Sequence, residues 1–127
     1  MTLELIWKGD PRTKKNHQQI HRASSGRPFI APGKEYQQYR KMCIWQVPQA
    51  ARLAIDYRVN VRCVYYMRTR RRCDLVNLLE ATCDILTDAG VVLDDHSGII
   101  AGHDGSRVQY DKHDPRVEIT ITPIFSE

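Results

Sequence analysis

The sequence has no apolar run that approaches the roughly 20 residues a membrane-spanning helix needs, so it predicts no membrane segment. Its first residues, MTLELIWKGD, include an acidic side chain and lack the long apolar core of a signal peptide, so a cytoplasmic location is expected. No internal repeat, low-complexity tract or linker divides the chain. Its 127 residues suffice for one core but not for two, so we expect one domain over residues 1–127.

The sequence has four cysteines, and their spacing matches neither a CxxC redox pair nor a zinc finger. None forms a CxxC pair, and none is followed by a histidine at zinc-finger spacing. Cys43 falls on the apolar side of a predicted helix and Cys63 on the apolar face of a predicted strand. We therefore expect reduced cysteines that pack as small hydrophobic side chains, and no zinc site.

Basic residues outnumber acidic ones, 19 to 15, which gives a formal net charge of +4. They cluster at Lys14 and Lys15, and again at Arg68 and at residues 70–72. Such clusters are typical of proteins that bind phosphates, although a solvated basic loop has the same composition. The first cluster lies in a long polar stretch, residues 12–32, which we expect to be a connection that contacts DNA.

Hydrophobic periodicity predicts six elements. Period-two alternation predicts four strands, over residues 3–8, 55–67, 99–103 and 117–124. Near-helical spacing predicts two helices, over residues 34–46 and 75–89. Asp74 is a good N-cap for the second helix, and Gly90 is a suitable C-terminal stop. The order β-α-β-α-β-β predicts an α+β fold in which a small mixed β-sheet packs against two helices.

The residues suited to chemistry are concentrated in residues 70–95, RRRCDLVNLLEATCDILTDAGVVLDD, where three arginines precede six acids. Arginines bind phosphates and clustered carboxylates bind divalent cations, so the combination indicates metal-dependent chemistry on a phosphodiester. Such an ion would neutralise charge on the phosphate and lower the pKa of an attacking water. The six acids are Asp74, Glu80, Asp84, Asp88, Asp94 and Asp95.

Three of these acids share one face of the second predicted helix with Asn77. Glu80, Asp84 and Asp88 follow one another at i,i+4, where like charges repel. Asp84 and Asp88 also lie toward the negative end of the helix dipole. This face therefore needs a positive partner, which could be a cation or the arginine run of the same or a second chain, unless water alone solvates it.

A metal site further requires that the chain fold back after the second helix. A reversal at Gly90 would bring Asp94 and Asp95 toward Asp74 and Glu80. An ordinary turn at the two aspartates explains the same residues without a metal.

The chain resembles the RusA-type Holliday junction resolvases in this order of features: a strand, a basic run, Asp at a helix start, Asn, DxL, Gly, apolar residues and then DD. The matching residues are Asp74, Asn77, Leu78, Asp84, Leu86, Gly90, Asp94 and Asp95. The opening GDPRTKKNH, with Pro11, Lys15 and Asn16, is similar to the start of that family. The resemblance covers essentially the whole chain. It implies a small homodimeric nuclease of phage origin that cuts four-way DNA junctions by paired nicks, with Mg²⁺, or Mn²⁺ in its place.

Two residues depart from the family's usual DxDNxxK motif, because the sequence here reads DLVNLLE. Val76 stands at the second aspartate and Glu80 at the lysine. Asp74 and Asp95 keep the first and last carboxylates of the family pattern. Glu80, on the same helix face, or Asp104 would supply the missing carboxylate.

These arguments assign three overlapping groups of residues. The predicted catalytic residues are Asp74, Glu80 and Asp95. The predicted metal ligands are Asp74, Glu80, Asp94 and Asp95. The predicted DNA contacts are Lys14, Lys15, Asn16, Arg70, Arg71 and Arg72, among which Arg72 or Lys15 would replace the charge of the family's lysine.

The leading hypothesis is a Mg²⁺-dependent endonuclease that resolves four-way or branched DNA junctions in recombination and repair. The alternative is a catalytically impaired DNA-binding protein of the same fold, in which Val76 and Glu80 mark a dismantled metal site. A third hypothesis is an interaction protein whose arginines pair with the acidic face of another chain. We expect His96, His103 and His113 to be solvated turn residues rather than general bases.

Overall fold

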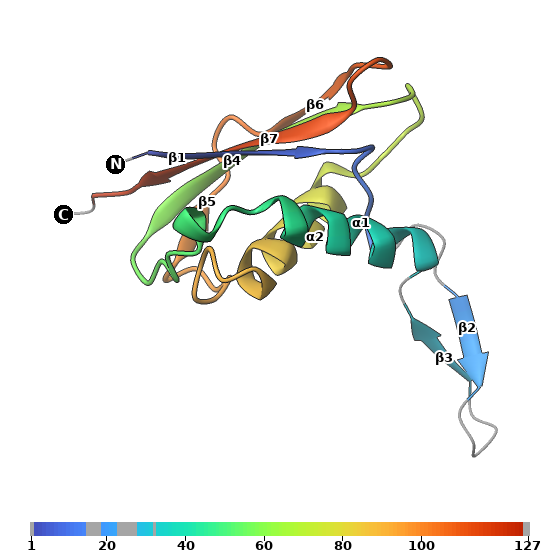
Figure 1. Ribbon diagram of the computed structural model, residues 1–127, viewed down its shortest axis with the longest axis horizontal. Coiled ribbons are helices and arrows are strands. Elements are labelled where there is room, and N and C mark those ends of the chain that lie inside the picture. The colour runs from blue at the N-terminus through green and yellow to red at the C-terminus, as the bar shows by residue number, and fades with distance from the viewer. Residues whose placement is uncertain (1, 15–18, 23–27, 32, 126–127) are drawn as a thin grey trace.

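The computed structural model describes residues 2–14, 19–22, 28–31 and 33–125. The elements follow the order β1 (Leu3–Lys8), β2 (Gln19–Arg22), β3 (Pro28–Ala31), α1 (Lys34–Gln46), a 3-10 turn η1 (Gln49–Ala51), β4 (Val59–Met67), α2 (Leu75–Asp88), β5 (Ile100–Gly102), β6 (Arg107–Tyr110) and β7 (Arg116–Pro123). Both helices lie on one face of the main sheet (Figure 1). The predicted α+β class, with a mixed sheet and two helices, is confirmed. Neither helix in the described part of the chain is long and apolar enough to cross a bilayer.

Strand β4 is the centre of the five-stranded sheet, whose order is β1-β7-β4-β5, with β6 also paired to β4. One edge of β4 pairs antiparallel with β7, which in turn pairs antiparallel with β1. Its other edge pairs in parallel with β5 at its start and with β6 from Val64 to Met67. The side chains at alternate positions of β4 face the helices and are buried, as the alternation predicts. The end of β4 therefore delivers the arginine run to one end of the sheet.

Between β5 and β6, side chains replace strand partners along the edge of β4. Nδ1 of His103 donates to the Val61 carbonyl at 2.8 Å, and Oγ of Ser106 accepts from the Cys63 amide at 2.9 Å. Backbone groups in a half-buried strand need such partners, so this loop completes the sheet. The expectation that His103 is a solvated turn residue is therefore wrong.

Three strands and the 3-10 turn were not predicted. Strands β2 and β3 lie within residues 12–32, which were predicted to be an irregular connection. Strand β6 lies in a stretch with turn composition, and its four residues are all exposed, so it has no alternation to detect. The predicted strand over residues 55–67 begins only at Val59. Upstream of it, Ile55 forms an isolated bridge with Val92.

The core lies between the sheet and the two helices. Its largest fully buried side chains are Trp7, Tyr65, Leu78, Ile85, Leu86, Ile119 and Ile121. Three free cysteines, Cys43, Cys63 and Cys83, are part of this core, and burial raises the pKa of each thiol to about 12. These thiols are therefore protonated at neutral pH and act as small apolar side chains, as expected from the sequence.

Arg52 joins the ends of the two helices. Its guanidinium donates to the Ala89 carbonyl beyond α2 at 3.0 Å, and to the Ile44 and Val47 carbonyls at the end of α1 at 2.9 and 3.2 Å. The last carbonyls of a helix lack intrahelical partners and carry partial negative charge. One arginine therefore satisfies both helix ends and holds α1 beside α2.

We expect Arg52→Met to lower the free energy of unfolding by about 2–4 kcal/mol, because methionine fills similar volume but removes the guanidinium bonds to three carbonyls, of which only that of Ile44 keeps another donor among the described residues, the Val47 amide. Denaturant unfolding followed by circular dichroism measures this change. The matched control is Arg58→Met, at an exposed arginine six residues away along the chain, which should change stability by less than about 0.5 kcal/mol. Equal losses in the two variants would show that Arg52 does not hold the helix ends.

Candidate active site and nucleic-acid interface

Helix α2 carries most of the predicted site residues. It begins where Oδ1 of Asp74 accepts a hydrogen bond from the Val76 amide at 3.0 Å, so Asp74 is the N-cap, as predicted. It is followed by Gly90, whose φ of +78° suits a residue without a Cβ atom. The apolar side of the helix packs on the core, which leaves its acidic residues on the outer side.

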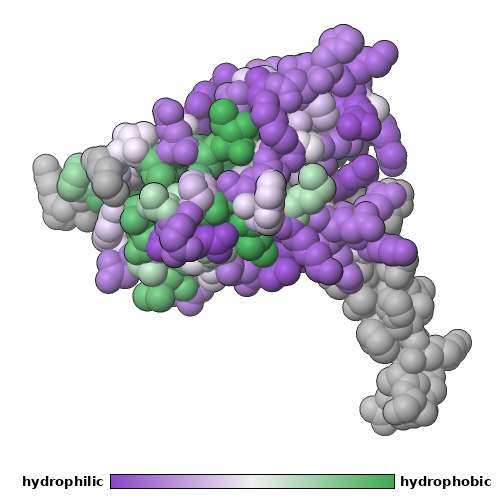
Figure 2. Space-filling model, in the orientation of Figure 1, coloured by the Kyte–Doolittle hydropathy of each residue, from purple (hydrophilic) through white to green (hydrophobic). Residues whose placement is uncertain are grey.

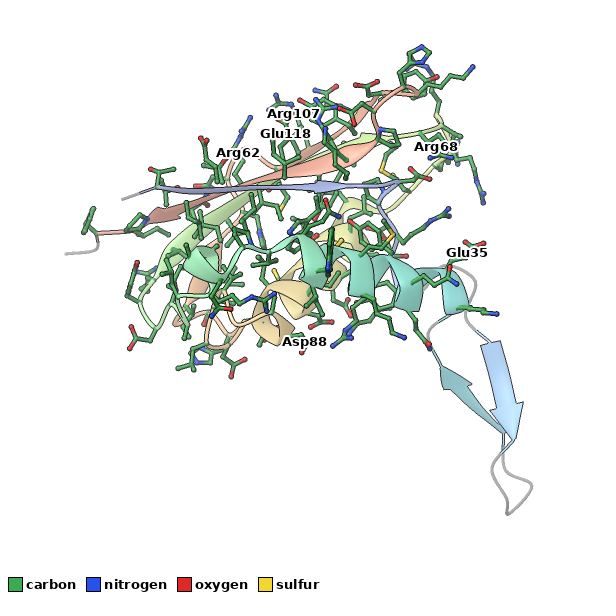
Figure 3. The ribbon with its side chains drawn as sticks, in the orientation of Figure 1. Glu35, Arg62, Arg68, Asp88, Arg107 and Glu118 are labelled. Atoms are coloured by element: carbon green, nitrogen blue, oxygen red, sulfur yellow. The ribbon has the colours of Figure 1, made fainter. Side chains whose placement is uncertain are left out.

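A pocket of about 510 Å³ lies between α1, α2 and the segment after α2, and we call it the acidic pocket. Two of its acids are already paired: Asp84 with Lys14, and Asp88 with Arg40 at 2.9 Å. Figure 3 shows Asp88 on the helical side of the molecule, away from the arginines at the end of the sheet. The positive partners of the acidic helix face thus come from the same chain, but not from the arginine run.

Tyr36 also lines the acidic pocket. Tyr36 is only 3% exposed, and its hydroxyl has no hydrogen-bond partner among the described residues. Burial, reinforced by the negative charge of Asp84, raises the pKa of Tyr36 to about 12, so it keeps its proton. A buried hydroxyl without a partner costs roughly 1–3 kcal/mol. A ligand that reached this hydroxyl would meet a donor that no described residue uses.

Asp95 lines the same pocket, and Oδ1 of its neighbour Asp94 accepts a hydrogen bond from the Asp95 amide at 2.7 Å. The pKa of the Asp95 carboxyl is raised, first by partial burial, then by the hydrogen bond with Asp94 and the negative charge of Asp84. Two carboxylates that repel one another favour a proton or a cation between them. Asp84 and Asp95 are therefore a pair that a divalent ion could share.

Asp74 lies in a separate hollow of about 560 Å³, together with Asn77, Arg72 and Thr13. Glu80 is exposed and forms no ion pair within the described part of the chain. Among the described residues, no three His, Cys, Asp or Glu side chains gather as a metal site. The assignment of Asp74, Glu80, Asp94 and Asp95 as metal ligands, and of three of them as catalytic, therefore stays a prediction.

Basic side chains gather where β4 ends, and we call this group the basic crest: Arg68, Arg70, Arg71, Arg72 and Lys112. All five residues are exposed, and none forms an ion pair with any residue that the structure describes. Figure 3 places Arg68 at this end of the sheet, and Figure 2 shows the surface there as hydrophilic. The arginines that were predicted to contact DNA are therefore available to bind phosphates.

The other predicted DNA contacts have different outcomes. Lys14 is paired with Asp84 rather than exposed beside the crest. Lys15 and Asn16 lie outside the described residues. Arg40 and Tyr36 were not predicted as site residues. They reach the acidic pocket only through the packing of α1 on α2, which the sequence does not show.

A model of the family Endodeoxyribonuclease RusA matches residues 8–122. The matched segment includes α2, the acidic pocket and the basic crest, and leaves out only a few residues at each end. No curated protein matches the chain.

We expect Asp84→Asn to lower the pKa of the Asp95 carboxyl, because the substitution removes a nearby negative charge and releases Lys14. An NMR titration of side-chain carboxyl carbons measures this pKa. The control is Asp111, whose pKa is lowered chiefly by its hydrogen bond with Arg116 and should not change. An unchanged pKa of Asp95 in this variant would show that the Asp84 and Asp95 carboxylates do not interact.

The raised pKa of Asp95 also determines how the stability of the fold depends on pH. The folded chain holds this proton more tightly than the unfolded chain does, so protonation of Asp95 stabilises the fold as pH falls through the raised pKa. Above that pKa the ionised carboxylate works against folding. Asp95→Asn should therefore raise the melting temperature at neutral pH and leave it nearly unchanged below the unfolded-state pKa.

Proposed function

Because the chain belongs to the RusA endodeoxyribonuclease family, we propose that it resolves four-way DNA junctions with Mg²⁺, as a dimer that makes paired nicks. Membership of this family supports an endonuclease that acts on branched DNA in recombination. The metal dependence, the paired cuts and the dimer are the proposed part. Their support comes from the arrangement of charge along one continuous surface.

The observation that carries the proposal is a path from the basic crest to the acids of α2. A hollow beside the crest, lined by Arg68, Arg71 and Arg72, shares Arg72 and Cys73 with the hollow that holds Asp74. Thr13 of that second hollow is followed in the chain by Lys14 of the acidic pocket. A DNA strand whose phosphates lie on the crest can therefore place its next phosphate beside the Asp74 carboxylate.

The residues present fit Mg²⁺, which needs only one or two protein carboxylates and takes waters and phosphate oxygens as its other ligands. Asp84 and Asp95 offer such a pair, and Asp74 offers a single carboxylate in the neighbouring hollow. When bound, the ion would neutralise phosphate charge and lower the pKa of an attacking water. The chain's own groups would position the DNA: the crest arginines by binding phosphates, and Tyr36 by donating its hydroxyl proton in a hydrogen bond.

One observation favours the alternative, a DNA-binding protein that does not cut. Val76, which stands at the family's second aspartate, is 69% exposed, and no group of three metal-binding side chains forms among the described residues. The hypothesis of an interaction protein has less support, because Lys14 and Arg40 already pair with Asp84 and Asp88 within the chain.

The deciding experiment is a gel assay on a synthetic four-way junction with Mg²⁺, Mn²⁺ or EDTA. We expect symmetric nicks that require metal, and a loss of about 100-fold or more in cleavage rate for Asp74→Asn and Asp95→Asn. DNA binding in EDTA should persist in both variants. The control is Asp56→Asn, which removes an exposed carboxylate that contacts no other described group.

Further substitutions separate the candidate ligands. Loss of cleavage in Glu80→Gln would establish Glu80 as the replacement for the missing aspartate. Cleavage that survives Glu80→Gln but not Asp84→Asn would place the ion in the acidic pocket instead. Junction binding with no cut in either metal would establish the non-catalytic alternative.

Paired nicks require two active sites, so we expect the protein to be a dimer in solution. Light scattering coupled to size-exclusion chromatography should give twice the chain mass of 14.7 kDa. A monomer at the concentrations that give symmetric nicks would contradict the dimer and would require two independent cutting events.

A further inference from the structure

The basic crest contains two hollows that the proposed cleavage chemistry does not use. One, of about 370 Å³, is lined by Met67, Arg71, Val108 and Gln109 together with the pair Arg70 and Tyr110. The other, of about 540 Å³, is lined by Arg68, Thr69 and Lys112 with the same pair. Thr69, Arg70 and Tyr110 line both, so the stacked pair of Arg70 and Tyr110 borders each of the two hollows. No aspartate or glutamate lines either hollow.

The pair is an aromatic ring stacked on a guanidinium at the surface. The guanidinium carbon of Arg70 lies 4.2 Å from the centroid of the Tyr110 ring, and Tyr110 is 38% exposed. The Tyr110 backbone is held rigidly, because it pairs with Met67 in the sheet and the next amide, that of Asp111, donates to the Met67 carbonyl at 2.9 Å. The backbone that carries the ring is therefore fixed, and the ring lies against Arg70 in a cationic patch.

Phosphates alone account for the cations but not for the exposed ring. A duplex presents phosphates outward and keeps the faces of its bases covered by neighbouring bases. Only an unpaired or unstacked base offers a free face to an aromatic ring, and every base has such a face, so this contact is tolerant of sequence. Cations on both sides of the ring match the phosphates on both sides of such a nucleotide.

We propose that Arg70 and Tyr110 bind one unpaired nucleobase at the branch point of a DNA junction by stacking, while Arg68, Arg71 and Lys112 bind the flanking phosphates. This inference rests on the proposed function and identifies the part of the substrate that the crest recognises. It assigns to strand β6 a role in binding the branch point that is separate from the acids of α2.

Binding of fluorescent four-way junctions in EDTA tests the site without cleavage. One junction carries an unpaired thymidine at the branch point, and its partner carries an abasic residue there, so the two have the same phosphates. We expect the wild type to prefer the thymidine junction. Tyr110→Leu should weaken binding of that junction by about 5- to 150-fold and remove the preference, whereas Tyr110→Phe should retain both.

The salt dependence of binding separates stacking from charge. Tyr110→Leu removes no charge, so the slope of log K against log salt should not change. Arg71→Ala, which removes one of the proposed phosphate contacts, should reduce the slope by about 0.7, the value for one phosphate contact on a single strand. The control is Arg58→Ala, which removes an arginine at the opposite end of β4 and should leave the slope unchanged.

A fluorescent base reports on the stacking directly. With 2-aminopurine as the unpaired base, fluorescence should fall on binding to the wild type and to Tyr110→Phe. Equal affinity of the wild type for the base-bearing and abasic junctions, or fluorescence that does not change on binding, would overturn the inference, even if Tyr110→Leu were to unfold. Preference for the unpaired base without cleavage in Mg²⁺ or Mn²⁺ would overturn the nuclease proposal alone and support the stacking site.

Discussion

Backbone pairing along β4 determines where both functional surfaces lie. β7 covers one edge of β4 through eight residue pairs from Val59 to Tyr66. On the other edge, β5 and β6 are joined by a loop whose His103 and Ser106 side chains satisfy the backbone groups between them. A slip of one residue would turn the core face of the strand outward. This register therefore fixes the point where the arginine run leaves the sheet and, seven residues after Arg68, where α2 begins.

The charges of the chain are divided between two surfaces with different consequences. On α2, repulsion among the carboxylates is offset by Lys14 and Arg40, which approach from other elements. Ion pairs as exposed as these contribute about 0–1 kcal/mol, so a divalent cation or a DNA phosphate can exchange with them. On the basic crest, no described acid forms an ion pair with the arginines, so a bound anion would relieve their mutual repulsion. The acidic surface can therefore exchange its ion-pair partners for a cation, whereas the basic surface can bind an anion directly.

The two residues that depart from the family motif, Val76 and Glu80, both lie on the surface. Val76 is exposed and packs on nothing in the core, so folding does not require a valine there. Glu80 is exposed as well. The fold therefore requires neither residue. Asp84, Asp95 and Tyr36 line one pocket, which adjoins the second half of α2, whereas Val76 lies in its first turn.

The sequence by itself determined the elements that have a periodic signal: β1, the two helices, β7, most of β4, and the ends of α2 at Asp74 and Gly90. It also determined the chemical character of residues 70–95, because arginines next to carboxylates are visible without a structure. Only the tertiary structure decided that β6 exists, that Arg52 joins both helix ends, and that Tyr110 meets Arg70. These features depend on single contacts between residues far apart in the chain, and such contacts leave no period in the sequence. The same reason explains the acidic pocket, which forms only when α1, α2 and the segment after α2 pack together.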